Sequence, residues 1–257
     1  MNIGRILAVA RNGFQEVLRD KILYIVGLFV IILILGAILL PPISVGADQK
    51  IFLDLGINAI SLIGAIVAIF VGTGLINKEI EKKTVLVLIP KPVARAEFII
   101  GKHLGLSAVI FVLLSTMTVF YLILLSTLKI PYNLGSILVA VAFILLELAL
   151  LVAVAMTFGV FTSSILATLF SFGVYIMGHL SRDLLQLGKI TDNPGVKQIT
   201  RLLYAIVPDL ERLNLKNGAV YNILPPTGEL FSALVYALLY IVFLLSITIL
   251  IFSRRQF

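Results

Sequence analysis

The apolar stretch ILVAVAFILLELALLVAVAMTFGVF, from Ile137 to Phe161, decides the fold class of this chain. Its only charged residue is Glu147. An apolar run of about 18 residues or more is long enough to cross a bilayer as a helix. A helix also satisfies its backbone polar groups within the segment, as a membrane requires. This stretch therefore predicts a transmembrane helix.

Five more apolar stretches predict further spans on either side of it. The chain has 257 residues, of which 60% are hydrophobic and 13% charged, and its mean hydropathy is +1.14. Soluble domains carry about 25% charged residues, so that class is excluded. The sequence predicts an all-α integral membrane protein with one transmembrane domain over residues 1–257. Its six spans are expected at residues 22–40, 55–76, 104–128, 137–161, 165–180 and 230–252. The stretch 165–180 is short, and a re-entrant helix is the alternative there.

Residues 1–21 predict an amphipathic helix before the first span. Apolar side chains recur at three- and four-residue spacing, at Ile3, Leu7, Ala10, Phe14 and Val17. A helix of this kind rests in the membrane interface with its apolar face down. The alternative is a positively charged leader without that role.

The distribution of basic residues predicts the orientation of the chain. Lysines and arginines gather before the first span, in the loop 77–103 and at the C-terminus. Because basic loops stay on the cytoplasmic side, both termini and this loop are expected in the cytoplasm. The loop 181–229 is then external, although it holds six basic and five acidic residues. Within it, an apolar stripe from Val196 to Ile206 predicts a helix on the outer leaflet.

The chain carries no recognisable catalytic apparatus. Cysteine is absent, which excludes disulfides, thiolate metal sites and a cysteine nucleophile. Neither G-x-x-x-x-G-K-[ST] nor G-x-G-x-x-G occurs, so these nucleotide-binding devices are excluded. The chain is not expected to be an enzyme, and any ATPase must belong to another polypeptide. Basic residues beside the spans explain the net charge of +7, so the expected partner is the lipid bilayer and not nucleic acid.

Glu147 is the only carboxylate inside a predicted span. A charge at that depth is costly, so it faces protein or water and is often functional. A structural hydrogen bond to a neighbouring helix or subunit is one interpretation, and a role in substrate passage or proton coupling is the other. His103 and His179 lie far apart at span ends, without nearby carboxylate pairs, so we expect each to be an interfacial polar residue and no metal site.

Residues 81–102 read EKKTVLVLIPKPVARAEFIIGK, and they closely resemble the cytoplasmic loop of type-2 ABC exporter permeases. The core of the resemblance is Lys-Pro-Val-x-Arg-x-Glu-Phe at Lys91–Phe98. Lys83 stands where the family usually has glycine, Ala94 where it has serine, and Ile89-Pro90 where leucine and serine are usual. Segments 11–24, 208–216 and 252–257 are similar to the entry helix, outer loop and C-terminus of the same family.

The resemblance implies a permease subunit of an ATP-driven exporter in the cell (inner) membrane. Two permease subunits, identical or related, would assemble with two ATP-binding subunits that hold ATP and Mg²⁺, and this chain would need no cofactor. A coupling helix within residues 77–89 would fit the ATPase. The docking residues expected from the resemblance are Lys78, Glu79, Glu81, Lys82, Lys83, Thr84, Leu86, Lys91, Arg95 and Glu97.

Two other functions are compatible with the sequence. A secondary transporter or channel would use Glu147 in an ion pathway, although the spans lack matched interruptions. A membrane anchor for an ATPase would transport nothing. The substrate is not encoded in any motif of the chain.

Overall fold

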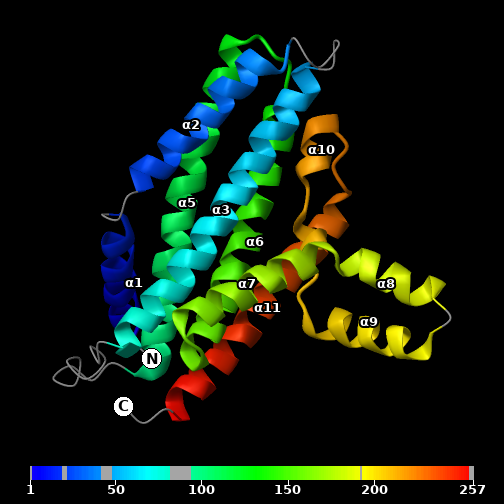
Figure 1. The fold of residues 1–257 in the computed structure, drawn as a ribbon. Coiled ribbons are helices and arrows are strands. Elements are labelled where there is room, and N and C mark those ends of the chain that lie inside the picture. Colours follow the sequence, from blue (N-terminus) through cyan, green and yellow to red (C-terminus); the bar gives the residue numbers. More distant parts are fainter. Residues whose placement is uncertain (1, 19–21, 42–47, 82–93, 192, 255–257) are drawn as a thin grey trace.

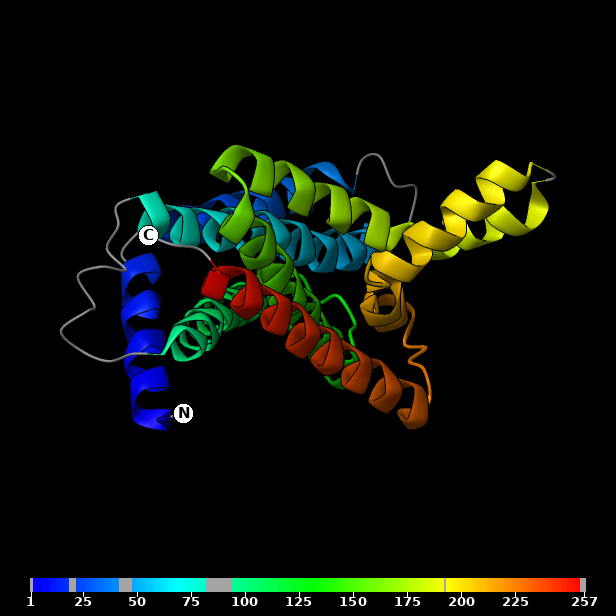
Figure 2. The ribbon, with the colours of Figure 1, turned by 90° about the horizontal axis from the view of Figure 1, so that it is seen from below.

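The computed structural model describes residues 2–18, 22–41, 48–81, 94–191 and 193–254, and all regular secondary structure in these ranges is helical. A long helical bundle carries a helical hairpin, α8 and α9, that projects to one side (Figures 1 and 2). The elements are α1 (Ile3–Leu18), α2 (Ile22–Leu39), α3 (Asp48–Glu81), α5 (Arg95–Thr127), α6 (Leu134–Phe161), α7 (Ser164–His179), α8 (Ser181–Ile190), α9 (Pro194–Ile206), η1 (Leu210–Leu213), α10 (Lys216–Tyr221) and α11 (Thr227–Arg254).

Four of these helices are long and apolar enough to cross a membrane: α5, α6, α11 and the part of α3 from Gln49 to Leu75. Helices α7 and α8 add a fifth span if the pair, bent by 61°, is counted as one. Residues Tyr24–Leu39 of α2 form a shorter apolar helix. The predicted all-helical membrane protein is confirmed, with four or five candidate spans, and the count of six stays a prediction.

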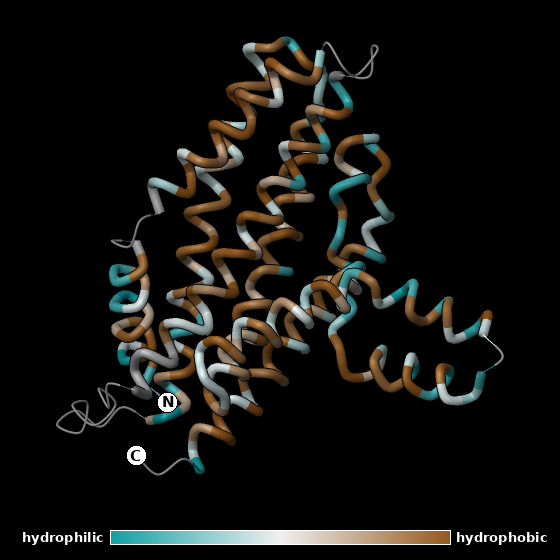
Figure 3. The backbone as a smooth tube through the Cα atoms, viewed as in Figure 1, coloured by the Kyte–Doolittle hydropathy of each residue, from teal (hydrophilic) through white to brown (hydrophobic). Residues whose placement is uncertain are grey.

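The apolar stretches mark only the central part of the long helices. Helix α3 continues to Glu81 and α5 begins at Arg95, so the segment 77–103 is helical at both ends. Hydropathy falls where a helix leaves the membrane, whereas the helix itself continues as long as its backbone bonds do. The segment 181–229 contains α8, α9, η1 and α10, and the stripe predicted from Val196 to Ile206 is α9. Figure 3 shows apolar colour over most of α2, α3, α5 and α6.

Helix α6 lies at the centre of the bundle, in contact with α3, α5, α7 and α11. Glycines let α3 approach it closely. A Cβ atom added to Gly64 would lie 2.5 Å from Leu148 Cδ1, and one added to Gly72 would lie 2.8 Å from Ala155 Cβ. In a membrane, such close packing replaces the hydrophobic effect as the main attraction between helices.

Buried hydroxyl groups join helices that are distant in sequence. Thr157 Oγ1 of α6 lies 2.9 Å from Thr248 Oγ1 of α11, and Thr73 Oγ1 of α3 lies 3.0 Å from Thr168 Oγ1 of α7. Each hydroxyl also bonds a carbonyl one turn earlier in its own helix. The hydroxyls thus stay satisfied in an apolar interior while they link the helices.

Candidate functional site

The end of α3 and the start of α5 lie at the same end of the bundle, together with α1 and the last turn of α11 (Figure 1). We call this the loop end. Lys78, Glu79 and Glu81 belong to the last turns of α3, and nothing is described of their side chains. Two predicted docking residues, Arg95 and Glu97, are on α5. The remaining ones lie outside the described residues: Lys82, Lys83, Thr84, Leu86 and Lys91.

Glu97 joins the start of α5 to the start of α1. Its Oε1 accepts a hydrogen bond of 2.7 Å from the backbone N–H of Asn2, and Arg5 Nη1 lies 4.0 Å from its Oε2. Oε2 also accepts from the backbone N–H of Ala94, at 3.1 Å, which caps the first turn of α5. Glu97 is only 3% exposed. Its carboxylate therefore serves contacts within the chain.

Arg95 joins the start of α5 to the end of α11. Its Nη1 donates to the carbonyl oxygen of Phe252, at 2.9 Å, and to that of Ser253. The last carbonyls of a helix lack partners within the helix, so a guanidinium is well suited to bind them. The rings of Phe98 and Phe252 stack beside this contact, with centroids 5.8 Å apart.

Two glycines seat α1 on the backbone of α5, where Figure 2 shows the two helices crossing. A Cβ on Gly101 would lie 2.9 Å from the carbonyl oxygen of Ile6, and one on Gly105 would lie 2.5 Å from that of Ala10. The pair has the G-x-x-x-G spacing that permits close helix approach. This contact was not predicted from the sequence, although the glycine spacing indicates it.

The second half of the family-like motif thus lies at a junction of three helices. Arg95, Glu97 and Phe98 contact α11 or α1, and Lys102 Nζ lies 3.6 Å from Glu16 Oε2 on α1. We call these residues of α5 and their partners the junction. Arg95 and Glu97 were expected to contact an ATPase, and that role stays a prediction. A glutamate at the third residue of a helix was the available signal for the cap.

A second polar group lies inside the bundle, where α6, α7 and η1 meet. Glu147 Oε1 lies 3.0 Å from His179 Nε2, and His179 Nδ1 lies 3.6 Å from Glu211 Oε2. We call these residues the trio. The predicted hydrogen bond from Glu147 to a neighbouring helix is present. His179 lies between two carboxylates, although no carboxylate pair was expected near it. His103 is buried, and its Nε2 lies 3.0 Å from the carbonyl oxygen of Ala149.

The segment η1 reaches the trio because small side chains make room for it. Leu210 and Leu213 are fully buried, and a Cβ on Gly178 would lie 2.7 Å from Leu210 Cγ. Ser181 Oγ donates to Asp209 Oδ1 at 2.7 Å and fixes the start of the segment. No periodic pattern in the sequence predicts that this segment packs against α6 and α7.

Glu211 is the member of the trio nearest to water. Burial raises the pKa of its carboxyl, but the His179 ring, 3.6 Å away, and a hydrogen bond from Asn214 outweigh burial, so the pKa lies below its ordinary value. A cavity of about 500 Å³ opens beside it, between α8, η1 and α11. Its lining mixes charged side chains, among them Arg182, Arg212 and Glu229, with apolar ones such as Leu185 and Leu230.

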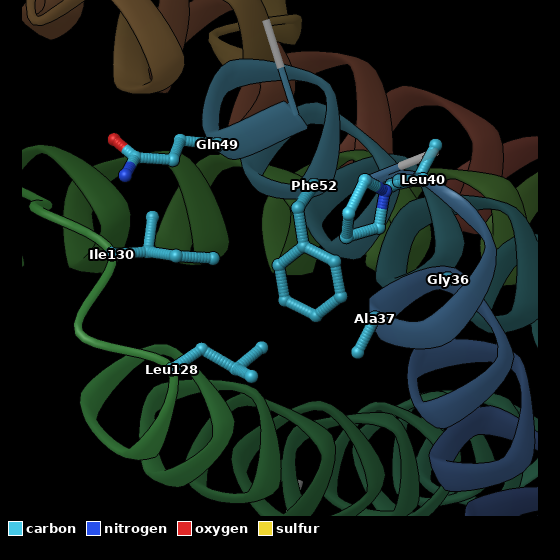
Figure 4. Close-up of a pocket in the computed structure, with 8 residues that line it drawn as sticks. Gly36, Ala37, Leu40, Gln49, Phe52, Leu128 and Ile130 are labelled. Carbon is cyan, nitrogen blue, oxygen red and sulfur yellow. The ribbon is translucent and has the colours of Figure 1, made fainter. Parts of the chain in front are cut away.

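A different cavity, of about 220 Å³, lies between α2, the start of α3 and the end of α5. Figure 4 shows Phe52 pointing into it, with Leu128 and Ile130 on the opposite wall. Apart from Gln49 its lining side chains are apolar. No charged side chain lines it.

A model of the ABC-2 family transporter proteins matches residues 7–257 of this chain. The chain belongs to the ABC-2 transporter family. The match includes the loop-end motif and confirms the resemblance found in the sequence. No curated protein matches the chain.

Membership in the ABC-2 family defines the general role of the protein. This ABC-2 family protein is a multi-pass membrane protein and a permease subunit of an ABC transporter. Permeases of this family associate with an ATP-binding subunit. Among the described residues, no group of three or more His, Asp or Glu side chains is arranged to hold a metal ion.

Proposed function

We propose that this ABC-2 family protein is the membrane subunit of an ATP-driven exporter in the cell (inner) membrane, with both termini in the cytoplasm. A separate ATP-binding subunit, which holds ATP and Mg²⁺, docks on the segment between α3 and α5. Two such subunits and two permeases, identical or related, form the transporter. Docking falls to the residues around the end of α3 and the segment after it: Lys78, Glu79, Glu81, Lys82, Lys83, Thr84, Leu86 and Lys91.

The junction is the observation that carries this proposal. Any displacement of the segment between α3 and α5 reaches α5 at its first turn, where Arg95 binds the end of α11 and Glu97 binds the start of α1. Three helices joined at one point move together, and rigid-body motion of packed elements is how transporters change state. For Arg95 and Glu97 we therefore propose transmission of motion in place of direct docking.

The first experiment tests docking. The protein is purified from native membranes in mild detergent, and co-purifying subunits are identified by mass spectrometry and assayed for ATPase activity. The double variant Glu79→Lys, Glu81→Lys should release the ATP-binding subunit. The control variant is Glu229→Lys. Glu229 lies on the first turn of α11, away from the loop end, so this variant should retain the ATP-binding subunit. A stable protein without any ATPase partner would refute the proposal and favour a secondary transporter that uses Glu147.

The second experiment separates transmission from docking. Spin labels on Leu7→Cys of α1 and Leu250→Cys of α11, both exposed positions, report the distance between these helices. ATP should change this distance in the intact complex. Arg95→Gln and Glu97→Gln should keep the ATP-binding subunit bound but lose the ATP-dependent change. If both variants still show the full change, the junction does not transmit motion.

A further inference from the structure

The carboxylate of Glu147 is only half satisfied. The residue is 0% exposed, its Oε1 lies 3.0 Å from His179 Nε2, and its Oε2 has no hydrogen-bond partner among the described residues. An ionised carboxylate in an apolar interior is costly unless a charge or a proton compensates it. Glu147 can therefore be ionised with a positive partner at Oε1, or it can be protonated and neutral, or it can alternate between these two states.

The geometry of His179 supplies that partner. Its two ring nitrogens face oxygens of two different carboxylates, Glu147 on one side and Glu211 on the other. A neutral imidazole has one N–H and one lone pair, so one nitrogen would present its lone pair to a carboxylate oxygen. A doubly protonated ring points an N–H at each. The arrangement therefore suits an imidazolium between two carboxylates.

Exposure to solvent differs between the three side chains of the trio. The exposed fraction of the side chain is 32% for Glu211, 19% for His179 and 0% for Glu147. Glu211 also lines the cavity of about 500 Å³ between α8, η1 and α11. Exposure therefore falls from Glu211, which borders the cavity, through His179 to the buried carboxylate of Glu147.

The other charged or titratable groups around the trio are few. The Tyr175 ring of α7 meets His179 edge-on, with centroids 4.8 Å apart. Lys216 of α10 interacts with His179 electrostatically, through its charge and without a hydrogen bond. Arg182 of α8 interacts with Glu211 in the same way. Asp209 and Arg212, which flank Glu211 in sequence, are paired with each other at 2.9 Å. None of these groups stands between His179 and either carboxylate.

We propose that the trio is a proton-binding site, filled from the cavity through Glu211 and serving Glu147 as the buried acceptor. At rest the proton is held on His179, which carries N–H on both nitrogens. Its transfer to Glu147 breaks the Nε2–H bond and forms an O–H bond on Oε1. The ring is then neutral and keeps the Nδ1–H toward Glu211, and no oxidant or cofactor takes part. This site is independent of the proposed ATPase docking at the loop end.

The charge state of His179 tests the proposal directly, because the chain has only two histidines. The full chain is labelled with ¹⁵N-histidine and studied by NMR in detergent micelles at neutral pH, and a His103→Gln variant assigns the signals. The wild-type His179 ring should be doubly protonated. Glu147→Gln and Glu211→Gln should each lower the ratio of doubly to singly protonated ring by about tenfold.

Glu229→Gln is the matched control, because Glu229 lines the same cavity without contacting the trio. It should leave the His179 signals unchanged. A wild-type His179 ring with a single N–H at neutral pH would overturn the proposal. Glu211 is partly exposed, so Glu211→Gln tests the path at a position that is not part of the core. If the His179 ring has the same charge state in this variant as in the wild type, the path through Glu211 is refuted.

Discussion

Replacing Glu97 with alanine is expected to release α1 from the start of α5. The carboxylate makes the two polar contacts described between these helices at this point, one with the backbone N–H of Asn2 at 2.7 Å and one with Arg5 at 4.0 Å. Alanine removes both. It also removes the bond to Ala94, which belongs to α5 itself and does not hold α1.

The size of the effect follows from these contacts. A hydrogen bond to a charged group contributes about 1.5–3 kcal/mol, but Asn2 is exposed, so water replaces part of what its N–H loses. The Arg5 contact adds at most about 1 kcal/mol, because the Arg5 side chain is well exposed. Together they amount to about 2 kcal/mol of docking free energy. That loss raises the population of undocked α1 by about 30-fold.

Thiol labelling measures this population, since the chain has no cysteine of its own. Ile6→Cys places a thiol on the buried side of α1, and its reaction with a maleimide tracks the undocked population when redocking is fast. Adding Glu97→Ala should accelerate labelling about 30-fold. Leu7→Cys, on the exposed side, should label equally in both backgrounds. An unchanged rate at Ile6→Cys would refute the assignment of Glu97 as the tie between α1 and α5.

Three further predictions concern the bundle. Gly56→Ala should destabilise the protein by about 1–3 kcal/mol, because the new Cβ would lie 2.1 Å from a buried tyrosine ring, whereas Gly27→Ala, with nothing within 4 Å, should be tolerated in the same thermal-unfolding assay. A double-mutant cycle of Thr157→Val and Thr248→Val should give a coupling of about 0.6 kcal/mol, and additive effects would contradict a hydrogen bond between them. The lowered pKa of Glu211 stabilises the fold above its ordinary value of 4.5, and this contribution is lost as pH falls through the folded-state pKa. Unfolding measured against pH should therefore show a shallower acid limb in Glu211→Gln, and an identical limb would contradict the lowered pKa.

The sequence predicted the class of fold because hydropathy is a local property. Every apolar stretch longer than about 18 residues became part of a helix, and so did the amphipathic repeats at residues 3–17 and 196–206. The family could also be recognised from the sequence, because residues 91–98 form a distinctive motif within one continuous stretch. The number of spans was less secure, because α7 is short and is followed by a sharp bend into α8.

The docking role of the charged residues in the motif stays a prediction. Arg95 and Glu97 stand in a charged, proline-flanked segment, and a charged residue in such a segment is expected to face a partner. The structure shows a further role that the sequence did not predict, because both side chains bind other helices of the same chain. The helix cap of Glu97 and the glycine spacing of α5 were present in the sequence, but neither says which helix would be the neighbour.

What the sequence alone determined is therefore what each segment is: apolar or charged, helical or not, and which family it resembles. Only the tertiary structure decided which side chains meet. His179 and Glu147 are 32 positions apart, and His179 and Glu211 are in segments joined by two further helices. Their encounter depends on the rotation and tilt of α6 and α7 and on the room that Gly178 leaves for η1. Rotation and tilt are set by the fit of whole helix surfaces against one another, and no single stretch of sequence encodes that fit.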